Sequence, residues 1–514
     1  MIRLLTNIPL PVHILLLVII PLLRLPGFDV NFLRPEESLY LLTAKQLANG
    51  GHLYTDMWHA GPPMMIGLVR LMQHLFGDYT QMALRIFGCL YLYLSAVYFN
   101  GIFGQHKSFR KSVGLRSVLF VILACVPWFA QEIGGSLIAL LPVCIAFYLI
   151  LQMGDDRKRN DRLMFWTGLW LMIGILVSYH VLFLWLAVMV LYLVTRTPRL
   201  HEFMSLVGGM LVVLLGLSLF LFFNGNLYDF WQQGVMYYLD HLRLSGELFY
   251  SSEIPVTSTM LFAWGGILLL AGIGFLHFRI RFFSYVAQVR TAETVMLIWT
   301  VCVSLLLFFK WKRLLLPDFI LLIPPLVFYA SKTFELRWMD RLRPLVLVLG
   351  LATPLYMHLS YLGLAFPDGL GSLRPGDQST FLHGGYKDMI ERTDERFAYL
   401  NGRSAPNGIW VLDHQPEIYL SLDQNCQLPW LDFRMAYYRL PVFRQRQQDT
   451  EDRIFLMWSG QESETNFYRQ FREKPADYLL DPADYFSYLQ NRYPNLFGDY
   501  REVSNRDGWK IYAR

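Results

Sequence analysis

The feature that most constrains this chain is a series of apolar segments, most of them close to the length needed to cross a lipid bilayer. Of its 514 residues, 54% are hydrophobic and only 17% are charged, whereas soluble domains carry about 25% charged residues. A membrane-spanning helix needs about 20 mostly apolar residues. The sequence therefore predicts about eleven spans, at 8–26, 81–104, 116–133, 135–153, 163–179, 181–195, 203–223, 256–276, 292–309, 314–331 and 343–362.

The basic residues predict an orientation in the membrane. Lys and Arg gather in every second loop, as expected for loops that stay in the cytoplasm. With a cytoplasmic N-terminus, the inside clusters lie at 107–116, 157–162, 196–199, 279–290 and 332–343. This alternation predicts an odd number of spans and an outside C-terminus. The net charge of +5 is therefore a topology signal and does not indicate nucleic-acid binding.

The composition divides the chain into two predicted domains. Residues 1–362 form a transmembrane domain with long outer loops at 27–80 and 224–255. Residues 363–514 are more polar and contain short apolar runs separated by turns, which is typical of a small α/β domain. The predicted strands are 408–412, 453–457, 477–480 and 508–512, and the predicted helices are 463–471 and 482–492. The expected fold is a polytopic α-helical membrane protein with a C-terminal extracytoplasmic α/β domain.

Two adjacent carboxylates stand at the beginning of the first outer loop. Pro35 precedes Glu36 and Glu37, and Gly50 follows a stretch with apolar residues at helical spacing. The pattern predicts a short amphipathic helix at the membrane interface. Neighbouring residues point to different sides of a helix, so one carboxylate can face a cavity while the other pairs or caps. The spacing alone leaves open whether the pair caps the helix or takes part in chemistry.

A second charged cluster contradicts the topology signal. Lys310, Lys312 and Arg313 fall in a predicted outside loop. They either extend toward lipid headgroups or form an anion site for a phosphate. Their opposition to the positive-inside pattern favours the phosphate site.

The first outer loop also resembles a known family. The segments Pro35-Glu36-Glu37-Ser38-Leu39-Tyr40 and Leu53-Tyr54, then Asp56, Trp58 and Pro62-Pro63, are similar to the first outer loop of C-superfamily glycosyltransferases. Within that superfamily they resemble the bacterial group related to protein O-mannosyltransferases and lipid A aminoarabinose transferases. The resemblance continues through Ala83-Leu84-Arg85, 317–325 and 477–512, so it covers most of the chain in the correct order.

Two positions depart from the family pattern. Glu36 stands where the family has its catalytic Asp, so the carboxylate is kept but its reach is one methylene longer. Gly61 stands where the family usually has the phosphate-contacting Lys before Pro62-Pro63. We therefore expect His59 or the basic cluster at 310–313 to supply the positive charge.

The resemblance implies a reaction and its partners. The donor would be a sugar linked to polyprenyl phosphate in the membrane lipid, and the acceptor a hydroxyl of a protein, lipid or glycan. Glu36 would act as general base, and Glu37 would position it or contact the acceptor. Lys310, Lys312 and Arg313 would stabilise the departing phosphate.

Further substrate-binding candidates surround this predicted centre. They are Tyr40, Asp56, His59, Arg85, His241 and Arg243. Arg85 is alternatively a structural anchor, Asp56 alternatively holds the loop, and His241 with Arg243 alternatively forms an exposed helix face. The carboxylates form no tight D-x-D cluster, so neither a divalent metal nor another cofactor is indicated.

Three function classes follow from these features. The first is an inverting glycosyltransferase of the bacterial inner membrane, with its outer loops and C-terminal domain in the periplasm. The second is a catalytically inactive relative that serves as a scaffold subunit of an envelope complex. A transporter is the least favoured class, because charges paired near the membrane midplane and repeated halves are not visible in the sequence.

Overall fold

The computed structural model of the protein describes most of the transmembrane part and a portion of the C-terminal part. The described residues are 8–24, 35–54, 62–103, 113–125, 134–154, 156–195, 199–236, 258–280, 287–309, 316–333, 397–400, 403, 405, 407–412, 418–419, 422, 469, 471–481, 484–506 and 508–514.

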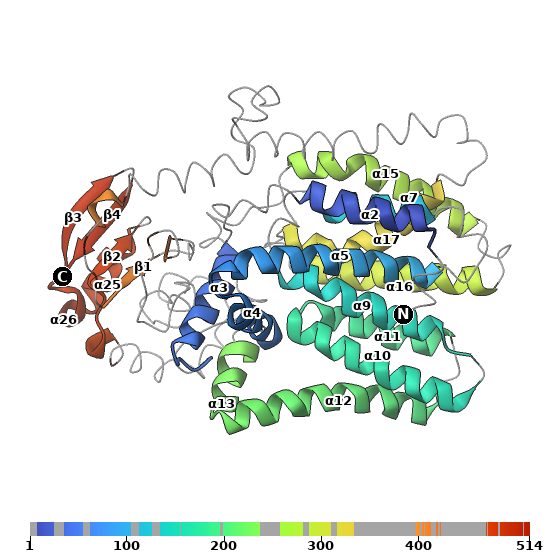
Figure 1. The fold of residues 1–514 in the computed structure, drawn as a ribbon, viewed down its shortest axis with the longest axis horizontal. Helices are drawn as coiled ribbons and strands as arrows, with labels where there is room; N and C mark the ends of the chain where they lie inside the picture. Colours follow the sequence, from blue (N-terminus) through green and yellow to red (C-terminus); the bar gives the residue numbers. More distant parts are fainter. Residues whose placement is uncertain are drawn as a thin grey trace.

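Long helices lie side by side in one bundle (Figure 1). They are α2 (Leu10–Leu23), α5 (Thr80–Phe103), α7 (Val113–Ala124), α9 (Gly135–Leu151), α10 (Arg157–Val177), α11 (Val181–Thr195), α12 (Leu200–Phe223), α15 (Ser258–Ile280), α16 (Ala287–Phe309) and α17 (Ile323–Thr333). These helices overlap the first ten predicted spans, and the eleventh, 343–362, lies outside the described residues. Within the described ranges, α5, α12 and the Arg290–Phe308 part of α16 are long and apolar enough to cross a membrane on their own. The count of eleven spans stays a prediction.

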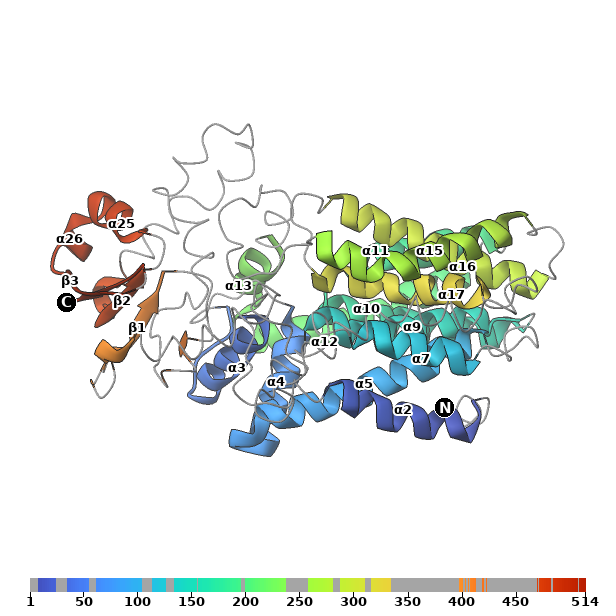
Figure 2. The same ribbon diagram turned by 90° about the horizontal axis from the view of Figure 1, so that it is seen from above.

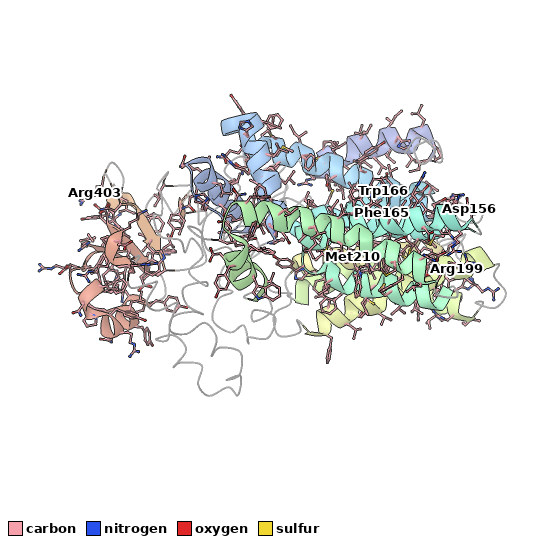
Figure 3. All side chains as sticks on the ribbon, turned by 90° about the horizontal axis from the view of Figure 1, so that it is seen from below. Asp156, Phe165, Trp166, Arg199, Met210 and Arg403 are labelled. Atoms are coloured by element: carbon pink, nitrogen blue, oxygen red, sulfur yellow. The ribbon has the colours of Figure 1, made fainter. Side chains whose placement is uncertain are left out.

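Shorter elements gather at one end of the bundle. They are α3 (Pro35–Ala48), α4 (Pro63–Phe76), η2 (Gly77–Tyr79), α13 (Leu227–Asp229) and the π-helical segment η3 (Phe230–Met236). Figures 1 and 2 show α3, α4 and α13 between the bundle and the C-terminal strands. Asp156 and Arg199 lie at the opposite end of the bundle, far from Arg403 of the C-terminal part (Figure 3).

Two glycines allow α10 and α12 to approach closely. A Cβ atom on Gly168 would lie 2.0 Å from the Leu206 carbonyl oxygen, and one on Gly209 would lie 2.0 Å from the Phe165 carbonyl oxygen. Figure 3 labels Phe165 on α10 and Met210, the residue after Gly209, on α12. Small residues at such crossings let helix backbones touch, which is a main source of packing energy inside membranes.

A buried tryptophan compensates for a proline in the bundle core. α17 begins at Ile323 directly after the 3₁₀ segment η6 (Leu316–Leu322), and Pro324 and Pro325 follow in its first turn. Because Pro325 has no N–H, the Leu321 carbonyl has no helical donor four residues later. The Trp299 indole N–H donates to this carbonyl at 2.8 Å. The Trp299 ring also stacks on Phe147 with 4.4 Å between ring centroids, so one side chain joins α16, α9 and η6.

The C-terminal part contains a mixed four-stranded sheet with the order β1-β2-β4-β3. Its strands are β1 (Ile409–Val411), β2 (Tyr478–Asp481), β3 (Arg501–Arg506) and β4 (Trp509–Ala513). β1 runs parallel to β2, and the other two pairs are antiparallel. Three short helical elements accompany the sheet: η9 (Ala398–Leu400), α25 (Phe486–Arg492) and α26 (Pro494–Phe497).

Three of the predicted strands are confirmed by β1, β2 and β4, whereas 453–457 lies outside the described residues. β3 was not predicted, because most of its side chains are polar and exposed and, within the described sheet, it is an edge strand that pairs with β4. α25 begins at Phe486, later than the predicted 482, because the Asp481 carboxylate accepts hydrogen bonds from the N–H groups of Tyr485 and Phe486 at 3.0 and 2.7 Å.

The glycine contacts lead to a test with a built-in control. We expect Gly209→Ala to lower the midpoint of thermal unfolding in detergent, because its Cβ would push α12 away from α10 at a cost of about 1–3 kcal/mol. The neighbouring Gly208→Ala should leave the midpoint unchanged or slightly higher, since its Cβ would meet only the Phe165 ring at 4.0 Å. Equal midpoints for the two variants would contradict the close crossing.

Candidate active site

The first outer loop contains α3, as predicted from Pro35 and Gly50. The helix ends in a hydrogen-bond pattern in which the Gly50 N–H donates to the Leu47 carbonyl at 3.3 Å and the Gly51 N–H donates to the Gln46 carbonyl at 3.1 Å. Gly50 has φ +90°, a conformation that costs glycine little. This double closure stops the helix sharply and turns the chain toward Tyr54.

A buried ion pair fastens α3 to α5. The Nε and Nη2 atoms of Arg85 donate to the two carboxylate oxygens of Glu37 at 3.3 and 3.4 Å, and both side chains are 2% exposed. A fork of two hydrogen bonds gives the pair a defined direction. Because the surroundings exclude water, removing either partner would leave the other as an uncompensated charge. The pair therefore fixes the position of the first turn of α3.

α3 lies between two hydrophobic cores. Tyr40 and Ala44 belong to the core of the helical bundle, whereas Leu39 and Leu42 belong to the buried cluster that includes Trp410 of the C-terminal sheet. Successive helix residues point about 100° apart, so the two pairs occupy different faces. α3 thus has two buried faces and not the single apolar face of the predicted amphipathic helix. Its location at the membrane interface stays a prediction.

Tyr54 joins the first outer loop to the second. Its side chain is fully buried, and its ring packs on Phe230 of η3 with 5.3 Å between ring centroids. The backbone of Tyr54 has φ 69°, which is uncommon for a residue other than glycine. Burial raises the pKa of Tyr54 well above its ordinary value, with a further contribution from Tyr179. The neutral ring thus holds the chain two residues before Asp56.

The structure brings together some of the predicted site residues. Glu37 and Arg85 are paired, and Tyr40 follows Glu37 by one helical turn and is buried in the bundle core. Glu36 lies in the first turn of α3 by its backbone. The remaining predicted residues lie outside the described part: Asp56, His59, His241, Arg243, Lys310, Lys312 and Arg313. The catalytic and substrate-binding roles of all these residues therefore stay predictions.

One charged residue of the bundle, Arg24, was not among the predicted site residues. Arg24 immediately follows α2, is 1% exposed, and lies against Gly88 of α5. The available signal was a charged residue inside a predicted span, which is costly in a membrane and often functional. Arg24, Arg85 and Glu37 are three charged side chains buried in the protein. The interior has a low dielectric constant, so interactions between charges are stronger there than in water.

The ion pair predicts a specific pattern of stability. We expect Glu37→Gln or Arg85→Met alone to lower the free energy of unfolding by about 3–5 kcal/mol, because each leaves a buried charge or polar group without its partner. The double variant Glu37→Leu/Arg85→Met should recover most of this loss. Thermal unfolding of the purified protein measures both effects.

A matched control is Arg514→Met, because Arg514 and Asp499 are 47% and 78% exposed in their ion pair. Exposed pairs contribute about 0–1 kcal/mol, so this variant should unfold close to the wild type. The pairing would be contradicted if the double variant lost as much free energy of unfolding as the two single variants lose together.

Comparison with known proteins gives a fold assignment. No protein-family model matches the sequence, and no curated protein matches it. ArnT from Cupriavidus metallidurans aligns in its apo state over 97% of both chains with a TM-score of 0.55 at 15% identity. The same protein bound to undecaprenyl phosphate gives a TM-score of 0.54 at 14% identity.

The apo oligosaccharyltransferase from Archaeoglobus fulgidus aligns with a TM-score of 0.50 at 12% identity, over 93% of this chain and 71% of that chain. The chain therefore shares its fold with ArnT and with the archaeal oligosaccharyltransferase.

Proposed function

We propose that the protein transfers a sugar from a polyprenyl-phosphate donor to an acceptor hydroxyl with inversion at the anomeric carbon. The observation that carries this proposal is the alignment with ArnT over 97% of both chains, together with the Glu36-Glu37 pair at the α3 end of the bundle. ArnT from C. metallidurans has been solved with undecaprenyl phosphate bound, which supports a donor of the same lipid class here.

The reaction assigns different work to the two carboxylates. Because Glu37 is paired with Arg85, we assign the general base to Glu36. Glu36 takes the proton of the acceptor hydroxyl while that oxygen attacks the anomeric carbon. The bond from this carbon to the phosphate oxygen breaks, and its electron pair leaves with the polyprenyl phosphate. Glu37 then acts as a positioning residue, because its ion pair sets the angle of the first turn of α3.

Positive charge is needed where the phosphate departs. The negative charge on that phosphate grows as the bond breaks, so fixed cations nearby stabilise the transition state. Lys310, Lys312 and Arg313 are our candidates, with His59 as a weaker one. Arg85 is less suited to the phosphate, since its guanidinium is already engaged with Glu37.

The packing of α3 supports a common side for the first outer loop and the C-terminal domain. Leu39 and Leu42 share a buried cluster with the C-terminal sheet, which requires an even number of membrane crossings between them. Of the described bundle helices, nine follow α3. If each of these crosses the membrane, the parity favours the eleventh predicted span, 343–362. We place both segments in the periplasm of a bacterium, at the outer face of the inner membrane.

The central test replaces Glu36 by Gln, which keeps the shape of the side chain but cannot accept the proton. We expect transfer to fall by at least about 100-fold while the lipid donor still binds. Mass spectrometry of envelope lipids and glycans, at matched protein levels in cells, should show one sugar modification missing in the variant. Its carrier would identify the acceptor as a protein, lipid or glycan.

The control is Glu473→Gln, at an exposed glutamate of the C-terminal part, which should leave the envelope profile unchanged. A Glu36→Gln variant with the wild-type profile and intact cellular function would overturn the base assignment. If deletion of the whole chain also left every sugar modification in place, a scaffold function would replace the proposed enzymatic function.

A further inference from the structure

Arg24 is a buried cation without a counter-charge in the part of the chain that the structure describes. Its side chain is 1% exposed, and neither Nη1 nor Nη2 has a hydrogen-bond partner. The backbone N–H continues the α2 hydrogen-bond pattern by donating to the Ile20 carbonyl at 3.0 Å. An unpaired buried guanidinium is costly by several kcal/mol, so its presence in the bundle needs an explanation.

The guanidinium of Arg24 packs against Gly88 of α5, where any larger side chain would collide with it. A Cβ atom on Gly88 would be 2.8 Å from Nη1 and 3.2 Å from Cζ. Gly88 follows Arg85 by three residues, so both positions are on the same side of α5. Because Arg85 is neutralised by Glu37, Arg24 adds an uncompensated positive charge beside the ion pair. The site lies about 12 Å along α5 from its start, at 1.5 Å per residue.

Among the described residues, the other neighbours of Arg24 include two thiols and supply no carboxylate partner. Cys89 and Cys125 lie within electrostatic range of its guanidinium. A thiol is a weak hydrogen-bond partner and behaves mainly as a small apolar group. The arrangement therefore matches a site for an anion that comes from outside the chain.

The surroundings select the kind of anion. The site is buried within an apolar bundle, so an anion with a long apolar body reaches it through the bilayer at lower cost than a hydrated ion. The planar guanidinium matches the oxygens of a phosphate and can donate two parallel hydrogen bonds. We propose that Arg24 binds the phosphate of the polyprenyl-phosphate lipid, in a reaction that rests on the function proposed above. This cation would stand in for the lysine that Gly61 replaces.

The direction of the reaction gives the site a preference. The donor is a phosphodiester with one negative charge, whereas the released polyprenyl phosphate is a monoester that carries a second ionisable oxygen. Arg24 therefore binds the product more strongly than the donor, and it stabilises the charge that develops as the bond to the sugar breaks.

The proposal predicts two opposite effects of Arg24→Gln. Without lipid, the variant should unfold at a higher temperature than the wild type, because a buried uncompensated charge has been removed. With lipid, its affinity for undecaprenyl phosphate should fall at least tenfold. A residue that served only the packing of α2 would lower the unfolding temperature and leave the affinity unchanged.

The experiment uses the full chain in nanodiscs of phosphatidylcholine. Binding of undecaprenyl phosphate, phosphatidylglycerol and inorganic phosphate is measured by native mass spectrometry and by the shift of the unfolding temperature. Gly88→Ala is a second variant that keeps the charge and displaces only the end of the Arg24 side chain, and it should also weaken binding of undecaprenyl phosphate. Arg157→Gln, at an exposed arginine of α10, should bind like the wild type.

Each outcome decides the matter. Weaker binding of undecaprenyl phosphate in both site variants, with higher stability of Arg24→Gln, supports the proposal. Wild-type affinity in Arg24→Gln overturns it and leaves the proposed function standing. Equal binding of phosphatidylglycerol or inorganic phosphate overturns the assignment to the polyprenyl monoester. A wild type that binds no undecaprenyl phosphate overturns both this proposal and the proposed donor.

Discussion

The buried ion pair between Glu37 and Arg85 is the constraint on which the candidate site depends. Two charges buried away from water are stable only while they face each other, so the first turn of α3 has little freedom relative to α5. Glu36 precedes Glu37 by one residue in the same helical turn, so its backbone is held in place as well. A general base works only when it is held at hydrogen-bond distance from the proton it takes. The ion pair thus restricts the backbone from which the proposed base extends.

α3 also connects the two hydrophobic cores of the molecule. Tyr40 packs into the helical bundle, and Leu39 packs into the cluster around the C-terminal sheet. Movement of the C-terminal domain would therefore act on the helix that carries the carboxylates. Tyr54 adds a second connection, because its ring fastens the first outer loop to Phe230 of the second. The site is assembled from segments that are far apart in the sequence but meet at one end of the bundle.

Local signals predicted the elements, whereas contacts between distant residues were beyond them. Apolar length located the spans, and Pro35 with Gly50 marked the limits of α3. The edge strand β3 was missed because its residues are polar and pair with a single neighbour. The second buried face of α3 was missed because the partners of Leu39 lie in the C-terminal domain. The role of Arg85 stayed open in the sequence, and the structure places its guanidinium against Glu37. Arg24 lies near the end of a predicted span, where basic residues are common, so its charge alone did not indicate a site.

The most direct test of the account is turnover by the purified protein. The wild type in nanodiscs is incubated with sugar-loaded polyprenyl phosphates and an envelope extract as acceptor, and the lipids are followed by mass spectrometry. The account predicts that one sugar-loaded lipid disappears while free polyprenyl phosphate increases by an equal amount and the sugar appears on an acceptor. A sugar-loaded lipid that binds the protein but remains intact with every acceptor fraction would contradict it.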